Sequence, residues 1–358
     1  MKVWLDFLTP KQVYFLGELS NRLEELGHEV FKTTRRYREV NEALGQRGIS
    51  ALVVGKHGGP DPKDKLIASA YRTAKLAGIV SEVQPDLSVA FASPEAARTA
   101  FGLGIPHYTV NDSPHSTAVA LLTVPLSKRL FTPKIIPLKA WTNLGIEQGK
   151  IIQYDALDPV AWLKHFHPNP NILKELGLTG TKPLMAFRVE ESLASYLLGK
   201  VPFDESIVIP IIEKLLQRLG ETIQILVLPR YKGQVYALRK RFHRRIFVPS
   251  KVVDGPSLLS YSTLFVGAGG TMTAEAALLG VPAISCYPGR PTHVESYLIR
   301  KGLVSRLTET DAVIEKVCKI LDEPPEWRGH LKEKAREMFF KMVDPIDVIV
   351  KTISRDFS

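Results

Sequence analysis

The chain has few cysteines, no long apolar run and none of the common metal-binding or hydrolase motifs. Only Cys286 and Cys318 occur among its 358 residues. They lack metal-ligand spacing, so we expect buried free thiols in a reducing cytosol. No apolar run reaches the roughly 18 residues that cross a bilayer, and the amino-terminal residues predict a strand, not a signal peptide. Asp-x-Asp, His-x-x-x-His and Gly-x-Ser-x-Gly are absent, so neither a metal site nor a serine hydrolase is indicated.

The composition is that of an ordinary globular protein, but its charge is unevenly distributed. Apolar residues make up 45%, charged residues 23%, and the net charge is +10. Residues 230–251, here called the basic run, contain no acid and the following Lys and Arg residues: Arg230, Lys232, Arg239, Lys240, Arg241, Arg244, Arg245 and Lys251. Such a run attracts anions, so it is either a solvated basic face or a peripheral contact with an anionic membrane or lipid phosphate. Nucleic acid is not favoured, because no helix-turn-helix, zinc-finger or RNA-binding aromatic pattern accompanies it.

The pattern of elements predicts two α/β domains, as the length also suggests. The first opens with a strand at Lys2–Phe7, a helix at Pro10–Leu26 and a strand at Val30–Thr33, which is typical of doubly wound sheets. Further strands are expected at Ala51–Val54, Leu87–Ala90, His107–Val110, Arg129–Thr132, Ile135–Pro137 and Ile151–Gln153, with helices near Asp64–Ser81 and Pro94–Leu103.

A proline-rich polar stretch at His165–Asn171 predicts a linker, after which the pattern restarts. Strands are expected at Leu184–Arg188, Thr222–Leu228 and Arg245–Pro249, and helices at Ser206–Leu219, Gln234–Phe242, Asp311–Leu321 and Trp327–Met342. The predicted divisions are an amino-terminal domain at residues 1–166, a second domain at 167–326 and a carboxyl-terminal helical segment at 327–358.

The most informative segment is a glycine-rich turn after the apolar strand that ends at Val266. It reads Val266-Gly-Ala-Gly-Gly-Thr-Met-Thr-Ala-Glu275 and precedes Gly-Val-Pro and another strand. Gly269 and Gly270 let backbone amides approach a ligand, Thr271 or Thr273 can cap the helix, and its positive amino terminus suits a phosphate. Glu275, in the first turns, can accept hydrogen bonds from ribose hydroxyls. The alternative is a tight strand-to-helix connection that binds nothing.

Other polar residues follow predicted strand ends, where ligands bind in doubly wound sheets. Asp112 and His115 can form a carboxylate–imidazole pair that acts as a general base, or Asp112 can merely stabilise an Asx-turn. Arg188 and Arg230 are candidate diphosphate ligands, and His293 suggests an anionic group near its loop. After the first strand, Thr9 and Pro10 suit a helix start, so a ligand role for Lys11 or Thr9 is a second interpretation.

The order of strand, glycines, threonine, glutamate, Gly-Val-Pro and strand carries a family resemblance. It resembles the nucleotide-sugar-binding segment of GT-B glycosyltransferases, especially the bacterial N-acetylglucosaminyltransferase that completes the lipid-linked peptidoglycan precursor, and of the non-hydrolysing UDP-N-acetylglucosamine 2-epimerases. Over its whole length the chain resembles a family of uncharacterised microbial proteins, catalogued as a domain of unknown function, that is related to both. The resemblance implies two Rossmann-like domains facing across a cleft, with the last helical segment crossing back to the first domain. It also implies that Glu275 binds the ribose of UDP while Gly269, Gly270 and Thr271 face the phosphates and sugar.

The expected function is metal-independent glycosyl transfer from a nucleotide-diphosphate sugar, which is a substrate and not a cofactor. The acceptor is unknown, and a lipid-linked or anionic acceptor would suit the basic run. Asp112 and His115 would deprotonate it, while Arg188 or Arg230 would neutralise the leaving diphosphate. Two alternatives stay open: a UDP-sugar 2-epimerase-like isomerase, whose spacing of acids the chain does not reproduce, and a non-catalytic nucleotide-sugar-binding protein.

Overall fold

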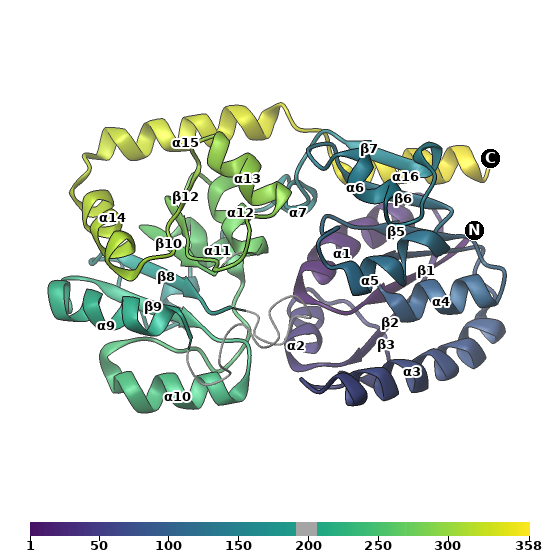
Figure 1. Ribbon diagram of the computed structural model, residues 1–358, viewed down its shortest axis with the longest axis horizontal. Helices are drawn as coiled ribbons and strands as arrows, with labels where there is room; N and C mark the ends of the chain where they lie inside the picture. The colour runs from purple at the N-terminus through teal and green to yellow at the C-terminus, as the bar shows by residue number, and fades with distance from the viewer. Residues whose placement is uncertain (191–205, 269) are drawn as a thin grey trace. The chain divides into compact units, whose positions relative to one another are not determined.

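The computed structural model describes residues 1–190, 206–268 and 270–358, and its contacts divide the chain into two units. Unit 1 comprises Met1–Lys164 together with Val343–Ser358, and unit 2 comprises His165–Met342. Each unit holds one parallel sheet covered by helices (Figure 1). The predicted α/β class with two doubly wound sheets is therefore confirmed.

Unit 1 contains a seven-stranded sheet in the order β3-β2-β1-β4-β5-β6-β7. Its strands are β1 (Lys2–Phe7), β2 (Glu29–Arg36), β3 (Leu52–Lys56), β4 (Leu87–Phe91), β5 (His107–Val110), β6 (Arg129–Pro133) and β7 (Ile151–Tyr154). Its helices are α1 (Pro10–Glu25), α2 (Arg38–Gln46), α3 (Pro62–Val83), α4 (Pro94–Gly102), α5 (Thr117–Leu121), α6 (Leu138–Thr142), α7 (Val160–Leu163) and α16 (Pro345–Asp356). The strand order reverses between β1 and β4, and ligands of such sheets bind outside the carboxyl ends of the strands at that switch point.

Unit 2 contains a five-stranded sheet in the order β12-β11-β10-β8-β9, with its switch point between β8 and β10. Its strands are β8 (Leu184–Arg188), β9 (Gln224–Leu228), β10 (Leu264–Gly267), β11 (Ala283–Ser285) and β12 (Val304–Arg306). Its helices are α8 (Ile172–Glu175), α9 (Val208–Leu219), α10 (Lys232–Phe242), α11 (Gly255–Ser260), α12 (Thr271–Leu278), α13 (His293–Arg300), α14 (Thr310–Asp322) and α15 (Pro325–Phe340).

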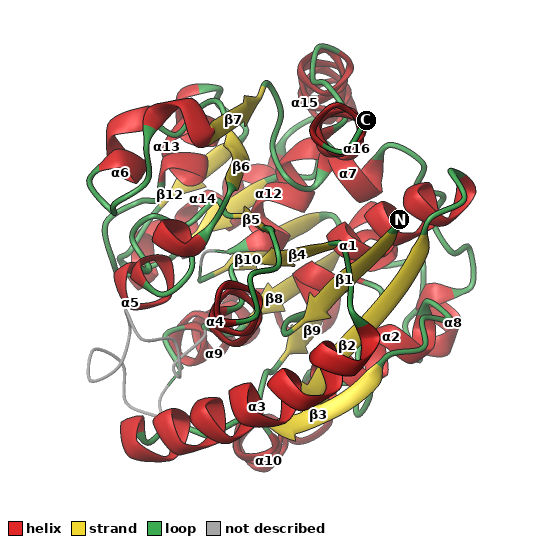
Figure 2. Ribbon diagram, turned by 90° about the vertical axis from the view of Figure 1, so that its right-hand side faces the viewer, coloured by secondary structure: helices red, strands yellow, loops and turns green. Residues whose placement is uncertain are grey.

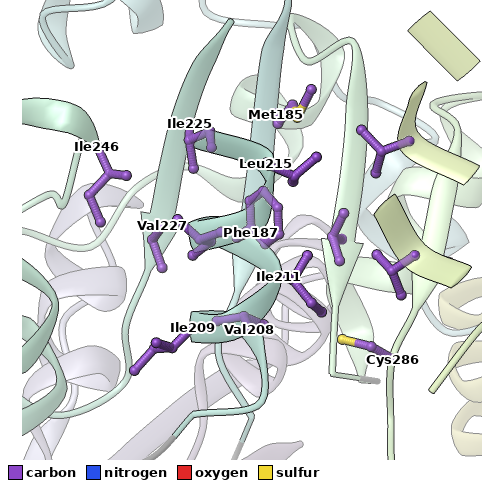
Figure 3. Packing of buried hydrophobic residues seen from close by; sticks show 14 of the residues in the cluster. Met185, Phe187, Val208, Ile209, Ile211, Leu215, Ile225, Val227, Ile246 and Cys286 are labelled. Carbon is purple, nitrogen blue, oxygen red and sulfur yellow. The ribbon is translucent and has the colours of Figure 1, made fainter. Parts of the chain in front are cut away.

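The core of unit 2 follows from the apolar face of α9, which carries a residue toward the sheet at every turn. Ile211 and Leu215 of this helix pack against Phe187 of β8 (Figure 3), and all three side chains are buried. Burying such a side chain stabilises the fold by about 1.5–3 kcal/mol. This packing fixes β8, and hence Arg188 at its end, against the rest of the sheet.

The structure corrects several predicted elements. Ile135–Pro137 forms a turn, in which the amide of Ile136 donates to Pro133 O, and not a strand. Arg245–Pro249 contributes only an isolated bridge between Phe247 and Leu226 of β9. The segment after residue 326 holds two helices, α15 and α16, because the Asp344 side chain caps a new helix start that Pro345 suits. Among the described residues, no helix is both long and apolar enough to traverse a bilayer.

Candidate functional site

The predicted glycine turn lies at the switch point of unit 2. Gly267 ends β10 and is the register partner of Arg188 on β8. A β-carbon on Gly267 would lie 2.5 Å from the Phe265 ring and 3.2 Å from Thr273 Oγ1, so only glycine fits there. Gly270 has φ of 93°, a backbone conformation that favours glycine, and it is the N-cap of α12. The sequence therefore makes an abrupt strand-to-helix turn at the place where ligands of this fold bind.

The start of α12 has the groups that an oxyanion requires. Its first amides have no intrahelical acceptor and carry partial positive charge. Thr271 is the first helical residue, and because Gly270 is the N-cap, neither Thr271 nor Thr273 caps the helix as predicted. The Thr273 hydroxyl is buried and has no hydrogen-bond partner among the described residues. Gly269, the other predicted ligand here, lies outside the described residues.

Glu275 is the fifth residue of α12 and is only 3% exposed. Its Oε2 lies near the start of α11, since a β-carbon on Gly255 would come within 3.7 Å of it. A buried carboxylate needs hydrogen-bond donors, which either a ligand's hydroxyls or the backbone can supply. The ribose contact of Glu275 therefore stays a prediction. The alternative is that Glu275 only stabilises the start of α11.

Arg188 and Arg230 hold together the ends of β8 and β9. Arg188 Nη1 donates to Pro229 O at 3.1 Å, beyond the end of β9. Arg230 Nε donates to Val189 O at 3.2 Å, beyond the end of β8. These backbone contacts fix both side chains at the carboxyl edge of the sheet, where a guanidinium suits a diphosphate.

The loop between β11 and α13 is fixed by residues that sequence patterns did not single out. Arg306 Nη2 donates to Gly289 O at 2.8 Å, and the buried Glu295 accepts a hydrogen bond from Ser285 Oγ at 2.5 Å. His293 is the first residue of α13 and is exposed. A histidine at that place can reach a ligand at the loop, but its predicted role in binding is not tested by the geometry.

Unit 1 has a buried charge cluster at the carboxyl ends of its strands. Lys11, in the first turn of α1, lies with Nζ 2.6 Å from Asp112 Oδ2 and 2.6 Å from Asp158 Oδ2. Its ammonium also lies 4.4 Å from the centre of the Phe91 ring. Asp158 in turn accepts a hydrogen bond from the Tyr154 hydroxyl at 2.5 Å. One cation thus bridges two carboxylates, of which Asp158 is buried while Asp112, like Lys11 itself, is partly exposed.

The two carboxylates of this cluster titrate in opposite directions. Burial raises the pKa of Asp158 to about 6, because Lys11 offsets the burial only partly and the Asp112 charge adds to it. Burial also acts to raise the pKa of Asp112, but the Lys11 charge and hydrogen bonds from Lys11 and Ser113 hold it below its usual value. A pair of acids with separated pKa values can hold one proton near neutral pH. Such a pair is suited to proton transfer.

Of the predicted base residues, Asp112 belongs to this cluster. His115 is exposed and lies two residues before Thr117, where α5 begins. Asp112 accepts from Lys11 and from Ser113 Oγ at 2.8 Å. Ala92, directly after β4, has φ of 51°, a strained value for a residue with a side chain. Strain next to a charge cluster at a switch point marks this edge of unit 1 as a candidate site.

No group of three or more His, Cys, Asp and Glu side chains in the described ranges is arranged to hold a metal ion. The sequence matches the family model described as "Protein of unknown function (DUF354)" over residues 1–353.

The chain belongs to the DUF354 family. An uncharacterized protein of Methanocaldococcus jannaschii, MJ0665, is 32% identical over 351 residues, which is 96% of this chain and 98% of that protein. The predicted membership of a family catalogued by unknown function is therefore confirmed.

Solved structures share the fold over the whole chain. The S. aureus MnaA–UDP co-structure has a TM-score of 0.77 at 14% identity, covering 99% of this chain and 96% of that one. The M. jannaschii UDP-GlcNAc 2-epimerase in complex with UDP-GlcNAc and UDP has a TM-score of 0.74 at 15% identity, covering 99% and 100%. The glycotransferase of kitacinnamycin has a TM-score of 0.64 at 13% identity, covering 100% and 99%. The predicted resemblance to epimerases and GT-B glycosyltransferases is thus confirmed at the level of fold.

Proposed function

We propose that this DUF354 protein is a metal-independent glycosyltransferase whose unit 2 binds a nucleotide-diphosphate sugar. The observation that carries the proposal is the start of α12: an obligatory glycine turn at the switch point, followed by a buried glutamate one turn into the helix. The diphosphate would lie against the α12 amides, and Glu275 would accept hydrogen bonds from the ribose. The unpartnered Thr273 hydroxyl gives this turn a further donor.

The leaving diphosphate would be neutralised by protein groups alone. When the acceptor oxygen attacks the anomeric carbon, the bond from that carbon to the diphosphate oxygen breaks and negative charge develops on the diphosphate. Arg188 and Arg230, fixed by their backbone contacts, can offer charged donors to it without reorganising. This arrangement requires no metal ion.

The acceptor hydroxyl must lose its proton during transfer, and unit 1 would receive it. Asp112 would take the proton, with His115 as the other candidate base, and Asp158, whose pKa is raised to about 6, can share it within the same cluster. Lys11 then acts as a positioning residue that keeps the two carboxylates together. A base of this kind contributes about 10²–10⁴-fold to the rate.

A UDP-sugar 2-epimerase-like isomerase is the second candidate, because the UDP-GlcNAc 2-epimerase structures of Neisseria meningitidis and M. jannaschii have higher TM-scores than the glycotransferase of kitacinnamycin. Methanocaldococcus jannaschii, however, has both a UDP-GlcNAc 2-epimerase and the uncharacterized protein MJ0665 that is similar to this chain. A second protein for the same reaction is less economical than a different reaction. Incubation with UDP-N-acetylglucosamine and no acceptor tests the isomerase. Formation of its 2-epimer or release of an altered sugar supports the isomerase, whereas binding without turnover leaves the transferase and the non-catalytic binding protein.

Calorimetric titration with UDP tests the site itself. Glu275→Gln keeps the size of the side chain and should weaken UDP binding by about 1–3 kcal/mol, the usual range for a lost charged hydrogen bond. The matched control is Glu221→Gln, an exposed residue before β9 that makes the same change of charge at the opposite edge of the sheet. If Glu275→Gln binds UDP as the native protein does but unfolds more readily, Glu275 only supports α11.

A further inference from the structure

A buried ion pair in unit 1 leaves a nearby arginine without a hydrogen-bond partner among the described residues. Asp6 accepts from Arg72 Nη1 at 3.0 Å and Nη2 at 2.5 Å, and also from the hydroxyls of Thr33 and Ser93. All of its acceptor sites are therefore in use. Arg35, near the end of β2, lies close enough to feel Asp6, Arg72 and Glu95 electrostatically. It cannot share Asp6 without displacing a bond that is already made.

Arg35 makes neither an ion pair nor a side-chain hydrogen bond with the described residues, and its Nε is buried. Burial lowers the pKa of Arg35, the Arg72 charge adds to this, and the attraction of Glu95 and Asp6 does not fully offset it. A partly buried guanidinium without partners destabilises a folded protein. A cation kept at such a cost is a candidate ligand-binding group.

His57 lies beside the end of β2, where its amide donates to Arg36 O at 3.2 Å. The charges of Arg35 and Lys65 add to burial in lowering the pKa of His57 to about 4, so the ring is neutral at pH 7. Its Nδ1 accepts a hydrogen bond from the Gly59 amide at 3.0 Å, and the ring stacks on Tyr37 with centroids 4.9 Å apart. The proton of the neutral ring is therefore on Nε2, which makes His57 a fixed donor.

The loop after β3 packs tightly onto the first turn of α3, which holds this group together. A β-carbon on Gly58 would lie 2.5 Å from Lys65 Cα, so the loop cannot be this close with any other residue. Figure 2 shows β3 and α3 side by side at the edge of the sheet. Arg35 comes from β2, His57 from the loop and Lys65 from α3, so three elements converge.

From this convergence we propose that Arg35, His57 and Lys65 form an oxyanion site in unit 1 that binds a phosphate group of the acceptor substrate. Guanidinium, imidazole N–H and ammonium are the donors that phosphate accepts, and two of the three are charged. The assignment to the acceptor rests on the proposed glycosyl transfer, but phosphate binding does not. The site would select acceptors that carry a phosphate.

Inorganic phosphate is the first probe, with thermal unfolding measured in phosphate and in sodium chloride of equal ionic strength. We expect phosphate to bind the native protein and Arg36→Gln alike, and Arg35→Gln at least about tenfold more weakly. Arg36→Gln is the matched control, because Arg36 is the exposed neighbour of Arg35. Comparison with this variant corrects for the general stabilisation that phosphate gives to folded proteins. In chloride, Arg35→Gln should unfold at the same or a higher temperature than the native protein, because it removes a buried charge that has no partner.

Equal phosphate responses of Arg35→Gln and Arg36→Gln would overturn the site, as would no phosphate response at all in the native protein. If Arg35→Gln does not fold, Arg35→Lys is the substitute, because it keeps the charge. Weaker phosphate binding by Arg35→Lys than by the native protein supports the site, and equal binding overturns it. The His57 ring resonances give an independent readout, which should shift with phosphate only where Arg35 is present.

Two further arms identify the source of the phosphate group. Glycerol 3-phosphate presents it on a soluble molecule, and phosphatidic acid vesicles present it on a lipid surface; Arg35-dependent binding in either arm supports the site and names its source. UDP calorimetry on Arg35→Gln should give the native affinity. If the native protein does not bind UDP, the proposed donor site is wrong, but the phosphate result is unaffected.

Discussion

Lys11 is the residue on which the charge cluster of unit 1 depends. Its Nζ lies 2.6 Å from a carboxylate oxygen of both Asp112 and Asp158, and burial penalises every charge in the group. Burial lowers the pKa of Lys11, but the two carboxylates raise it above its ordinary value, so the ammonium stays charged. The cluster then has one cation for two acids, and Asp158 is the acid that takes up a proton first as the pH falls.

Replacement of Asp158 should therefore change how stability depends on pH. The pKa of Asp158 is about 6 in the folded protein and about 4 when unfolded, so between these values the folded state binds the extra proton. Its contribution is fully present below about pH 4 and is lost as pH rises through 6, by up to about 3 kcal/mol. The difference in free energy of unfolding between native protein and Asp158→Asn, from urea titrations, should follow that course.

Asp155→Asn is the control for this measurement, because Asp155 is an exposed neighbour paired with Lys134. A difference between native protein and Asp158→Asn that stays flat from pH 4 to 7 would contradict the raised pKa. If activity with an acceptor is found, its low-pH limb near 6 should also disappear in Asp158→Asn.

The candidate site was predictable from sequence in unit 2 and only in part in unit 1. Gly267 to Glu275 is continuous in the chain, so the turn and the buried glutamate could be found by pattern. Lys11, Asp112 and Asp158 come from three distant segments, and only their positions after strands gave a signal. Asp158 follows no predicted motif, because its importance comes from burial beside Lys11, which no local pattern expresses.

At the scale of elements, Asp356 joins α16 to the sheet of unit 1. Asp356 Oδ2 accepts from the Tyr108 hydroxyl at 2.7 Å and from Arg129 Nε at 2.8 Å, and Arg129 Nη2 lies 3.2 Å from Oδ1. These hydrogen bonds hold the pKa of Asp356 well below its usual range. A helix that joins a sheet through a charged, bidentate contact is placed by that contact as well as by its apolar face.

Asp356→Asn should destabilise the protein more than Asp347→Asn, which breaks the half-exposed ion pair between α16 and Arg22. We expect a loss of about 1–3 kcal/mol in the free energy of unfolding, because Arg129 and Tyr108 lose a charged acceptor. Asp347→Asn, which breaks a half-exposed pair with Arg22, should cost at most about 1 kcal/mol. Urea denaturation compares the two, and equal losses would contradict the anchoring role of Asp356.

Element boundaries were predictable where apolar periodicity met a cap, and not elsewhere. The strands β1, β4, β5, β8 and β9 lie close to their predicted ranges because each is a short apolar run between turn residues. The helix α2 was not predicted, since Arg38–Gln46 is mostly polar and only part of one face is buried. The segment Arg245–Pro249 has the composition of a strand, but only Phe247 pairs with a neighbour, Leu226, at a single bridge.

At the scale of the whole molecule, the net charge of +10 is only partly concentrated in the basic run. Arg241 pairs with Glu213, while Arg239 and Arg245 donate to the carbonyl oxygens of Val248 and Leu216. These contacts engage part of the run in the fold of unit 2. Lys240, Arg244 and Lys251 are exposed side chains that can meet an anionic surface.

Co-sedimentation with anionic vesicles tests whether the basic run contacts membranes. Binding should occur at low salt and fade at high salt, because the Debye length falls from about 10 Å at 0.1 M to about 3 Å at 1 M. Changing Lys240, Arg244 and Lys251 to glutamine should abolish it. The same change at exposed Lys174, Lys182 and Lys319 removes equal charge from unit 2 and should preserve most of it. If the native protein ignores the vesicles at low salt, the run is only a solvated face.

The division of unit 1 into two stretches of chain has a consequence for its synthesis. Arg129 and Tyr108 leave the ribosome long before Asp356, since all of unit 2 is translated in between. Unit 2 is continuous and can complete its sheet first, even though unit 1 began earlier. Until α16 arrives, the nascent amino-terminal sheet lacks the helix that packs against α1 and α7. Unit 1 would therefore complete its fold after unit 2, although domains usually fold in the order of their synthesis. We expect the chain to need a chaperone most before α16 is synthesised, while unit 1 is incomplete.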